Sequence, residues 1–439
     1  MTIAAAVAAV VVALCAGVGV TSIVWPRREP LPWLAWFGLA GVLGPCAVGF
    51  GLLLCGALGV PSVVSLPLLA AASVLAGIDA FRRRAARGQA APLGHRALMV
   101  LVLVASTWTG ALALRTHLGW DGTVGWYGKA RIIAAGNGAL PTAALADATR
   151  TWMAPDYPLH VPLAMAWVRL WLPVEDERAI KLLPATWAAA LFCLVAAAVL
   201  ERSRVGAGAD RRAACAVVVL ASAPRVLVGE GGLTSGYADG PVAALLAATV
   251  WTAWRANWGG DGRFLPLLGT LAAALAWTKQ EGAVAVAIVA VACMWRHRRL
   301  RTGSFALPAA ALVATWQVWT IWQGAPTGMA YAWPGMREAA ARLGPIARAY
   351  LTEVPDVRTW GLLWVGLGAA MAVTWTRAHR IPLAILAGIV LAGAGAFTLS
   401  DWPDLEAHLE VTVPRQLMQI VALATILAFC EGETTRDRG

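Results

Sequence analysis

The sequence predicts an all-α membrane protein, a polytopic bundle of transmembrane helices. Hydrophobic residues make up 59% of the chain and charged residues only 13%, whereas charged residues make up about a quarter of a soluble domain. The apolar runs are long and do not alternate with polar residues, which is typical of spanning helices and not of barrel strands. Arginines gather in short clusters between these runs, as they do in the cytoplasmic loops of membrane proteins.

With these clusters in the cytoplasm, the apolar runs predict about thirteen crossings. The first run has no basic residue before it and is long enough to span, so we interpret it as a retained helix and not as a cleaved signal. The amino terminus then faces outside. In chain order the runs are residues 3–25, 32–57, 61–81, 97–115, 182–200, 213–228, 241–256, 265–278, 282–295, 304–323, 359–376, 381–399 and 415–430.

One apolar stretch, residues 158–173, is long enough only for a short span. If it crossed the membrane, the basic cluster that follows it would lie outside, so we interpret it as a re-entrant or interfacial helix. Its Trp167 and Trp171 suit the level of the lipid headgroups. The segments then expected on the outer face are 116–181, 229–240, 324–358 and 400–414.

Several classes of function have no support in the sequence. The net charge of +11 comes largely from the arginine clusters, so it indicates membrane topology and not nucleic-acid binding. The seven cysteines lie in or beside apolar runs and form no CxxC pair, which indicates neither a zinc site nor a disulfide framework. The Walker, Rossmann, HExxH and GxSxG patterns are absent.

Most of the acidic residues lie in the outer segments or in the short turn at 278–282 that joins them. An acidic side chain costs about 2.5 to 3.5 kcal/mol at the centre of a spanning helix. These residues therefore belong either to solvated loops or to a water-filled cavity. The candidates are Asp121, Asp156, Glu230, Asp239, Glu281, Asp401 and Glu406.

Residues 118–138, LGWDGTVGWYGKARIIAAGNG, place an acid and two cations in the first large outer segment. Apolar residues recur near helical spacing from 122 to 135, and a Gly-Asn-Gly stop follows, which predicts an amphipathic surface helix. Asp121 has two interpretations. It caps this helix, a contribution of about 1 kcal/mol, or it is a functional acid.

Residues 153–163, MAPDYPLHVPL, contain three prolines that enforce an extended entry and rigid turns. The segment is either a simple return into the membrane or a fixed loop that presents Asp156, Tyr157 and His160 to a cavity. The sequence leaves both interpretations open.

Two cations lie near the expected outer ends of crossings. Lys279, with Glu281, lies at the tip of a helical hairpin in AWTKQEGAVA, which is either a polar turn or the position of an anion-binding lysine. Arg415 opens the final crossing on the outer side, against the usual charge bias. Its planar guanidinium suits phosphate, and snorkelling to lipid headgroups is the alternative.

The order of these elements resembles a known family. An acid in the first large outer loop, a "YP…PL" element, the loop SGYADGP and the turn KQEG are similar to the polytopic GT-C glycosyltransferases, in the branch of protein O-mannosyltransferases and lipid A aminoarabinose transferases. The likeness covers about 97–430. It implies a GT-C-type catalytic module there, with juxtamembrane helices in outer loop 116–181. Residues 1–96 then form additional transmembrane helices, and 431–439 form a cytoplasmic tail.

The resemblance implies transfer of a sugar from a polyprenyl-phosphate carrier at the outer face of the plasma membrane. In the family the first-loop acid is catalytic, and the matching residue here is Asp121 in GWDG, where relatives often have two adjacent acids. A general base deprotonates the acceptor hydroxyl, and the leaving phosphate needs a cation. We assign the phosphate to Lys279 and Arg415, with Lys129 as a weaker candidate. The sugar or acceptor pocket is assigned to Asp156, Tyr157, Asp239 and Glu281.

The expected partners are the polyprenyl-phosphate sugar, membrane lipids and a glycan, lipid or protein acceptor, with no role for nucleic acid. The resemblance leaves a requirement for a divalent metal open, and the sequence contains no cluster of metal ligands. The main alternative is a secondary transporter or a flippase for lipid-linked glycans, and a glycan polymerase or ligase is a further one. Transporters place ionisable groups near the bilayer midplane, whereas the acids here are expected at one face.

Overall fold

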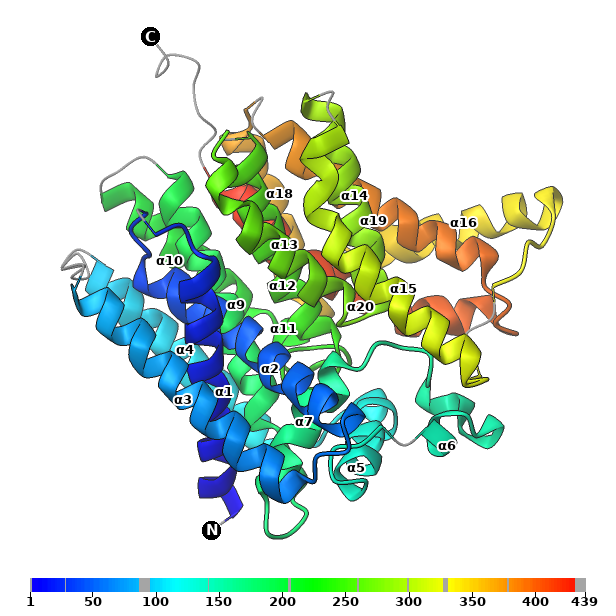
Figure 1. The fold of residues 1–439 in the computed structure, drawn as a ribbon. Helices are drawn as coiled ribbons and strands as arrows, with labels where there is room; N and C mark the ends of the chain where they lie inside the picture. The colour runs from blue at the N-terminus through cyan, green and yellow to red at the C-terminus, as the bar shows by residue number, and fades with distance from the viewer. Residues whose placement is uncertain are drawn as a thin grey trace.

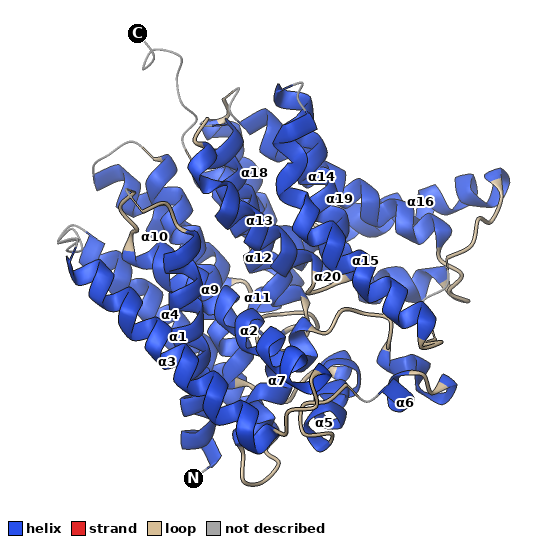
Figure 2. Cartoon of the chain, in the orientation of Figure 1, coloured by secondary structure: helices blue, strands red, loops and turns tan. Residues whose placement is uncertain are grey.

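The computed structural model describes residues 2–27, 29–86, 95–140, 142–203, 207–258, 260–297, 300–326, 331–376 and 379–430. Within these ranges every regular element is helical and no strand occurs (Figure 2). One isolated antiparallel bridge joins Tyr331 to Ser400. The all-α prediction is therefore confirmed for the described chain. The expected tail, residues 431–439, lies outside the described residues.

The first half of the chain supplies part of the bundle and a group of short helices at one end (Figure 1). A π-helical segment, Gly122–Tyr127, runs into α5, and a 3-10 segment, Ala148–Met153, precedes α7. The α-helices are α1 (Thr2–Val24), α2 (Trp33–Ala57), α3 (Ser62–Ala86), α4 (Arg96–Arg115), α5 (Gly128–Ala135), α6 (Thr142–Leu145), α7 (His160–Trp171), α8 (Glu177–Ile180), α9 (Leu182–Arg202) and α10 (Ala207–Ser222).

The second half completes the bundle and adds α16, which projects to one side (Figure 1). Short π or 3-10 segments occur at Trp254–Trp258, Gly262–Phe264 and Leu300–Ala306. The α-helices are α11 (Pro224–Val228), α12 (Asp239–Ala253), α13 (Leu265–Ala276), α14 (Gln280–His297), α15 (Leu307–Trp322), α16 (Met336–Glu353), α17 (Val357–Trp360), α18 (Leu363–Thr374), α19 (Arg380–Leu399) and α20 (Leu405–Phe429).

Eight helices of the described chain are long and apolar enough to cross a membrane, namely those containing α1, α2, α3, α4, α9, α15, α19 and α20. This number supports a membrane protein. It does not confirm the expected count of about thirteen crossings. The difference arises because several predicted crossings are short helices: α12 has 15 residues, and α13 and α18 have 12 each.

The centre of the bundle is α12, whose residues are all buried. Helices α9 and α20 pack against it. Because α12 has almost no exposed surface, its apolar side chains pack against other helices and not against lipid. Its first residue, Asp239, is therefore held inside the protein, at the point where the loop 229–238 enters the bundle.

Helix α7 is the stretch expected to be re-entrant or interfacial. It has 12 residues, and its positions from His160 to Val168 are buried. Trp167 is 1% exposed, and its Nε1 donates a hydrogen bond to the carbonyl of Ala9 in α1 at 3.0 Å. The expected headgroup position of Trp167 is therefore wrong, because α7 packs between helices of the bundle.

Helix α20 begins ten residues before the predicted final crossing. Asp404 caps it, because the carboxylate accepts a hydrogen bond from the amide of Ala407 at 3.0 Å. Pro414 is accommodated inside the helix. The prediction that Arg415 opens the crossing at its lip is thus wrong, and Arg415 lies well within α20.

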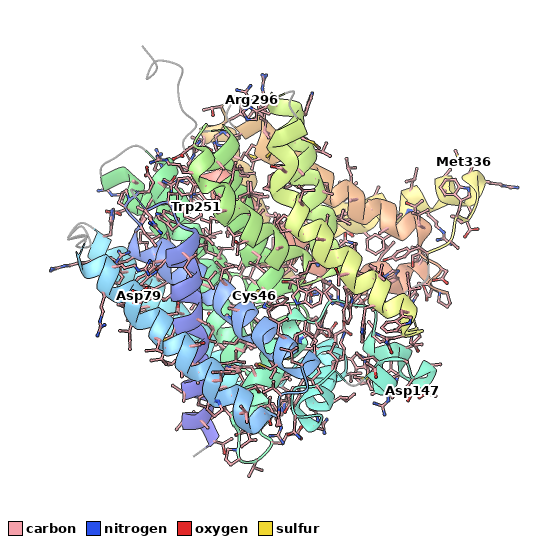
Figure 3. The ribbon with its side chains drawn as sticks, in the orientation of Figure 1. Cys46, Asp79, Asp147, Trp251, Arg296 and Met336 are labelled. Atoms are coloured by element: carbon pink, nitrogen blue, oxygen red, sulfur yellow. The ribbon has the colours of Figure 1, made fainter. Side chains whose placement is uncertain are left out.

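The two ends of the bundle are distinct. Arg296, near the end of α14, lies at one end, and Asp147 lies at the other, beside α6 (Figures 1 and 3). The first turn of α1 lies at the same end as α5 (Figure 1). We call this the α5 end. It contains the short helices of the large loop 116–181.

Candidate functional site

A cavity of about 880 Å³ opens where α19 and α20 meet the loop segments of the α5 end. One side is polar and comes from the π-helical segment, the 151–157 loop, the α13–α14 turn and the middle of α20. The other side is apolar and comes from α19 and α20. We call this space the main cavity. Its titratable lining residues are Asp121, Lys129, Tyr157, Lys279, Glu281, Tyr331, Tyr350, His408 and Arg415.

Asp121 lies at the start of the π-helical segment, but its side chain makes no capping hydrogen bond. Instead, Oδ2 accepts a hydrogen bond from Nη1 of Arg415 at 2.6 Å, and the Asp121 side chain remains 40% exposed. In the described part of the chain Oδ1 accepts no hydrogen bond. The capping interpretation of Asp121 is therefore wrong, and the residue presents a carboxylate to the main cavity.

The glycines around Asp121 explain how it reaches this position. A Cβ at Gly119 would lie 2.5 Å from the ring of Tyr237, and one at Gly122 would lie 2.4 Å from the carbonyl oxygen of Ser235. Both contacts are too close for any residue but glycine. The GWDG segment therefore lies directly on the SGYADG loop, where the hydroxyl of Tyr237 accepts a hydrogen bond from the Asp121 amide at 3.1 Å.

Asp239 joins the cations behind the cavity surface. Its side chain is 0% exposed and does not line the main cavity. Oδ1 accepts hydrogen bonds from Lys279 at 3.0 Å and Gln419 at 2.6 Å, and Oδ2 accepts one from Nε of Arg415 at 3.1 Å. The sequence led us to expect Asp239 on the surface of the pocket. It lies behind that surface instead and positions Lys279 and Arg415.

Lys279 immediately precedes α14 and is almost fully buried, yet it lines the main cavity. Its Nζ lies 3.0 Å from Asp239 and 2.8 Å from Glu281. Burial alone would lower the pKa of Lys279, but the two carboxylates outweigh burial and raise it. Lys279 is therefore a permanent cation at neutral pH. The KQEG sequence forms an ion-paired site and not merely a polar turn.

Lys129 lies in α5 and lines the cavity separately from this network. Its Nζ donates a hydrogen bond to the carbonyl of Ala154 at 3.0 Å and lies 4.9 Å from the ring centroid of Trp126. The rings of Trp126 and Tyr157 stack at 5.9 Å. Burial lowers the pKa of Lys129 to about 7, although Asp156 partly opposes the shift. This cation is thus available only near or below neutral pH.

Asp156 and Tyr157 occupy the proline-bounded loop as expected, with different exposures to the cavity. Tyr157 lines it, whereas Asp156 is buried and accepts a hydrogen bond from Nε2 of Gln280 at 3.0 Å. His160 faces away and bonds Thr278 at 2.8 Å and the thiol of Cys46 at 3.0 Å. The loop therefore ties the KQEG turn in place and brings one of its three polar residues to the cavity.

The sequence interpretation missed three contributors to this site. Tyr237 supports Asp121, and its ring lies 4.7 Å from the guanidinium of Arg415. Gln419 binds Asp239, and Tyr350 of α16 lines the cavity. Arg415 and Gln419 are four residues apart, the spacing that places two side chains on one face of a helix. That spacing in PRQLMQI was the available signal for Gln419.

No family model matches this sequence, and no curated protein or solved structure matches it. Within the described ranges, no group of three or more His, Cys, Asp or Glu side chains is placed to hold a metal ion. The chemistry of the site therefore has to be inferred from the ion pairs and the shape of the main cavity.

Proposed function

We propose that this protein is a membrane glycosyltransferase of the GT-C type. It transfers a sugar from a polyprenyl-phosphate carrier to an acceptor hydroxyl, at the outer face of the plasma membrane. One observation supports the proposal above all: the partly exposed carboxylate of Asp121 shares Arg415 with the buried carboxylate of Asp239. A potential base and a phosphate-binding cation thus lie in direct contact inside one cavity. The order of sequence motifs agrees with this function.

The shape of the main cavity suits an amphipathic donor. Its apolar wall lies on α19 and α20, which are both candidate membrane spans. A polyprenyl chain is as apolar as lipid, so it can follow this wall while its phosphate reaches the polar side. The wall residues include Ile389, Val390, Ala396, Leu399, Val411 and Ile420.

Arg415 and Lys279 form ion pairs with one buried carboxylate, that of Asp239, and with two partly exposed carboxylates. The side chains of Asp121 and Glu281 are 40% and 35% exposed, whereas that of Asp239 is 0% exposed. A donor phosphate would therefore replace the exposed carboxylates on Arg415 and Lys279, and Asp239 would keep both cations in place. Guanidinium groups bind phosphate oxygens through two parallel hydrogen bonds. This exchange releases Asp121 from Arg415 at the moment the donor binds.

The released Asp121 is then the general base. Its carboxylate takes the proton of the acceptor hydroxyl while the acceptor oxygen bonds to the anomeric carbon. The bond from that carbon to the phosphate oxygen breaks, and its electron pair leaves with the polyprenyl phosphate, whose charge Arg415 and Lys279 stabilise. A single displacement of this kind inverts the anomeric configuration.

The test uses the purified full chain in lipid nanodiscs with a panel of polyprenyl-phosphate sugars and cell-envelope acceptors. Polyprenyl-phosphate release by the wild type should fall by about 10²–10⁴-fold in Asp121→Asn, the contribution typical of a general base. Asp79→Asn is the matched control, because Asp79 is an exposed acid on α3 that pairs with Arg83 and does not line the main cavity. It should keep wild-type activity.

Two results would count against the proposal in different ways. Unchanged release in Asp121→Asn would remove Asp121 from its role as base. Absence of release by the wild type, with every donor and acceptor in the panel, would overturn the transferase proposal itself. Folding of each variant is checked by size-exclusion chromatography and by its unfolding temperature.

A secondary transporter or lipid-linked glycan flippase is the second candidate. The buried contacts among Asp239, Lys279, Arg415 and Gln419 favour it, because ionisable groups inside a helical bundle are typical of transport pathways. Proteoliposomes loaded with a labelled lipid-linked sugar separate the two functions. A transporter moves the intact donor across the bilayer, whereas a transferase consumes it.

A further inference from the structure

A second cavity, of about 600 Å³, is lined by other residues of α5 than the main cavity. It is enclosed by α5, the 3-10 segment at 148–153 and the end of α7. We call it the arginine cavity, because three of its lining residues are arginines. Its lining consists of Gly128, Arg131, Ile132, Ala134, Ala135, Arg150, Trp152, Met153, Arg169, Leu170 and Glu175.

The charges in the arginine cavity are unbalanced. Arg131 pairs with Glu175 at 2.9 Å, and Arg150 pairs with Asp147 at 3.1 Å. Arg169 has no carboxylate partner among the described residues, and its Nη1 reaches only the carbonyl of Leu172, at 3.4 Å. Three guanidinium groups thus face two carboxylates, and the guanidinium of Arg169 is available to an external anion.

The two cavities share a wall. Trp152 and Met153 line both of them, and Trp152 is 58% exposed. The arginine cavity is therefore adjacent to the space that Asp121 lines. None of the residues that form the apolar wall on α19 and α20 lines the arginine cavity, so this cavity does not suit the polyprenyl chain of the donor.

We infer that the arginine cavity binds a phosphate group carried by the acceptor. This inference rests on the proposed transferase function and extends it to the acceptor, whose hydroxyl would enter the main cavity while its phosphate stays on Arg169 and Arg131. All the cations in the cavity are arginines, and the planar guanidinium binds phosphate through paired hydrogen bonds. The acceptor is accordingly an anionic, phosphate-bearing molecule and not a neutral one.

The first experiment measures binding without any donor, so that its outcome does not depend on turnover. Inorganic phosphate is titrated by calorimetry into the full chain in nanodiscs of neutral phosphatidylcholine. Arg169→Gln should weaken phosphate binding at this site by about tenfold or more, the loss expected for one charge-assisted contact. Arg348→Gln is the matched control, because Arg348 is an exposed arginine on α16 and lines neither cavity.

Equal phosphate binding by wild type and Arg169→Gln would overturn the inference, whatever the donor experiments show. Arg131→Gln provides a second variant if Arg169→Gln fails to fold. Nanodiscs that contain phosphatidylglycerol distinguish the two sources of phosphate. Phosphate affinity that is unchanged in them supports a soluble or glycan phosphate, whereas competition by this lipid would assign the cavity to a lipid headgroup and overturn its role in acceptor binding.

The second experiment applies once a donor and acceptor pair is active. Arg169→Gln should raise the KM for a phosphorylated acceptor by about tenfold and leave the KM for the donor unchanged. It should also leave the KM for the dephosphorylated form of the same acceptor unchanged. An equal loss with both forms would show that Arg169 acts only on structure and would overturn the inference.

Discussion

Asp239 carries a buried negative charge that is satisfied by three side chains, Lys279 before α14 and Arg415 and Gln419 on α20. A buried carboxylate is costly unless its partners are also charged and well placed. Lys279 and Arg415 meet this requirement, and Gln419 adds a neutral hydrogen bond. Asp239, which is fully buried, therefore positions the two cations that the proposed donor phosphate would contact.

Lys129 supplies a prediction of pH dependence. Burial lowers its pKa from 10.5 to about 7, whereas a lysine in the unfolded chain keeps its ordinary pKa. Between these two values the unfolded state binds the proton that the folded state has lost, so the contribution of Lys129 to stability rises with pH across this window. Lys129→Met removes the contribution. The variant should gain several degrees of unfolding temperature over the wild type at pH 7.

The measurement is the unfolding temperature of both proteins in nanodiscs at pH 7 and pH 10. The advantage of Lys129→Met should shrink at the higher pH, because pH 10 approaches the ordinary lysine pKa of 10.5 and most of the cost of burying a neutral lysine has then disappeared. A difference that is the same at both pH values would show that the pKa of Lys129 is not lowered in the folded protein.

Among the elements, α1 and α2 make the closest helix contact of the amino-terminal region. A Cβ at Gly17 would lie 2.1 Å from the carbonyl oxygen of Ala40, and one at Gly44 would lie 2.2 Å from that of Ala13. Small residues let helix backbones approach in this way inside membranes. Helix α1 packs on α2 and α3, and α2 in turn packs on α7 and α9. The amino-terminal helices are thus joined to the rest of the bundle.

Gly17→Ala should destabilise the protein by about 1–3 kcal/mol, the usual cost of overpacking. The methyl group meets backbone and not a flexible side chain, so the helices must separate. Gly366→Ala is the matched control, because Gly366 also lies in an apolar helix and a Cβ there meets nothing within 4 Å. Unfolding temperatures in nanodiscs compare the two variants, and an equal effect would contradict the close packing of α1 and α2.

At the scale of the whole molecule, the proposed outer-face site depends on which end of the bundle faces outward. A cysteine at Ala148, which is exposed next to Asp147 at the α5 end, should react with a membrane-impermeant thiol reagent in intact cells. A cysteine at Arg296, at the opposite end, should react only after permeabilisation. The unmodified chain measures the background reaction of the native cysteines. The reverse pattern would place the main cavity on the cytoplasmic side.

The helices follow from the sequence because hydropathy is a local property. Each predicted apolar run contains a helix, and the stop after residue 135 is confirmed by the end of α5 and by the positive φ angles of Asn137 and Gly138. The count of about thirteen crossings is not confirmed, because a helix such as α12 can be short and apolar when other helices surround it. The extent of α20 was also underestimated, since its first turns contain polar residues, of which His408 and Thr412 line the main cavity.

The sequence by itself determined the all-α class, the membrane character and most of the titratable residues that line the main cavity. Only the tertiary structure decided their partners. The Arg415–Asp121 contact joins residues 294 positions apart, and the Arg415–Asp239 contact joins residues 176 apart. Hydropathy and turn chemistry act between neighbours in the chain, whereas such ion pairs exist only once packing has brought distant segments together. For that reason only the folded protein shows that Asp239 positions the cations. It also shows that Asp121 makes no capping hydrogen bond and is partly exposed.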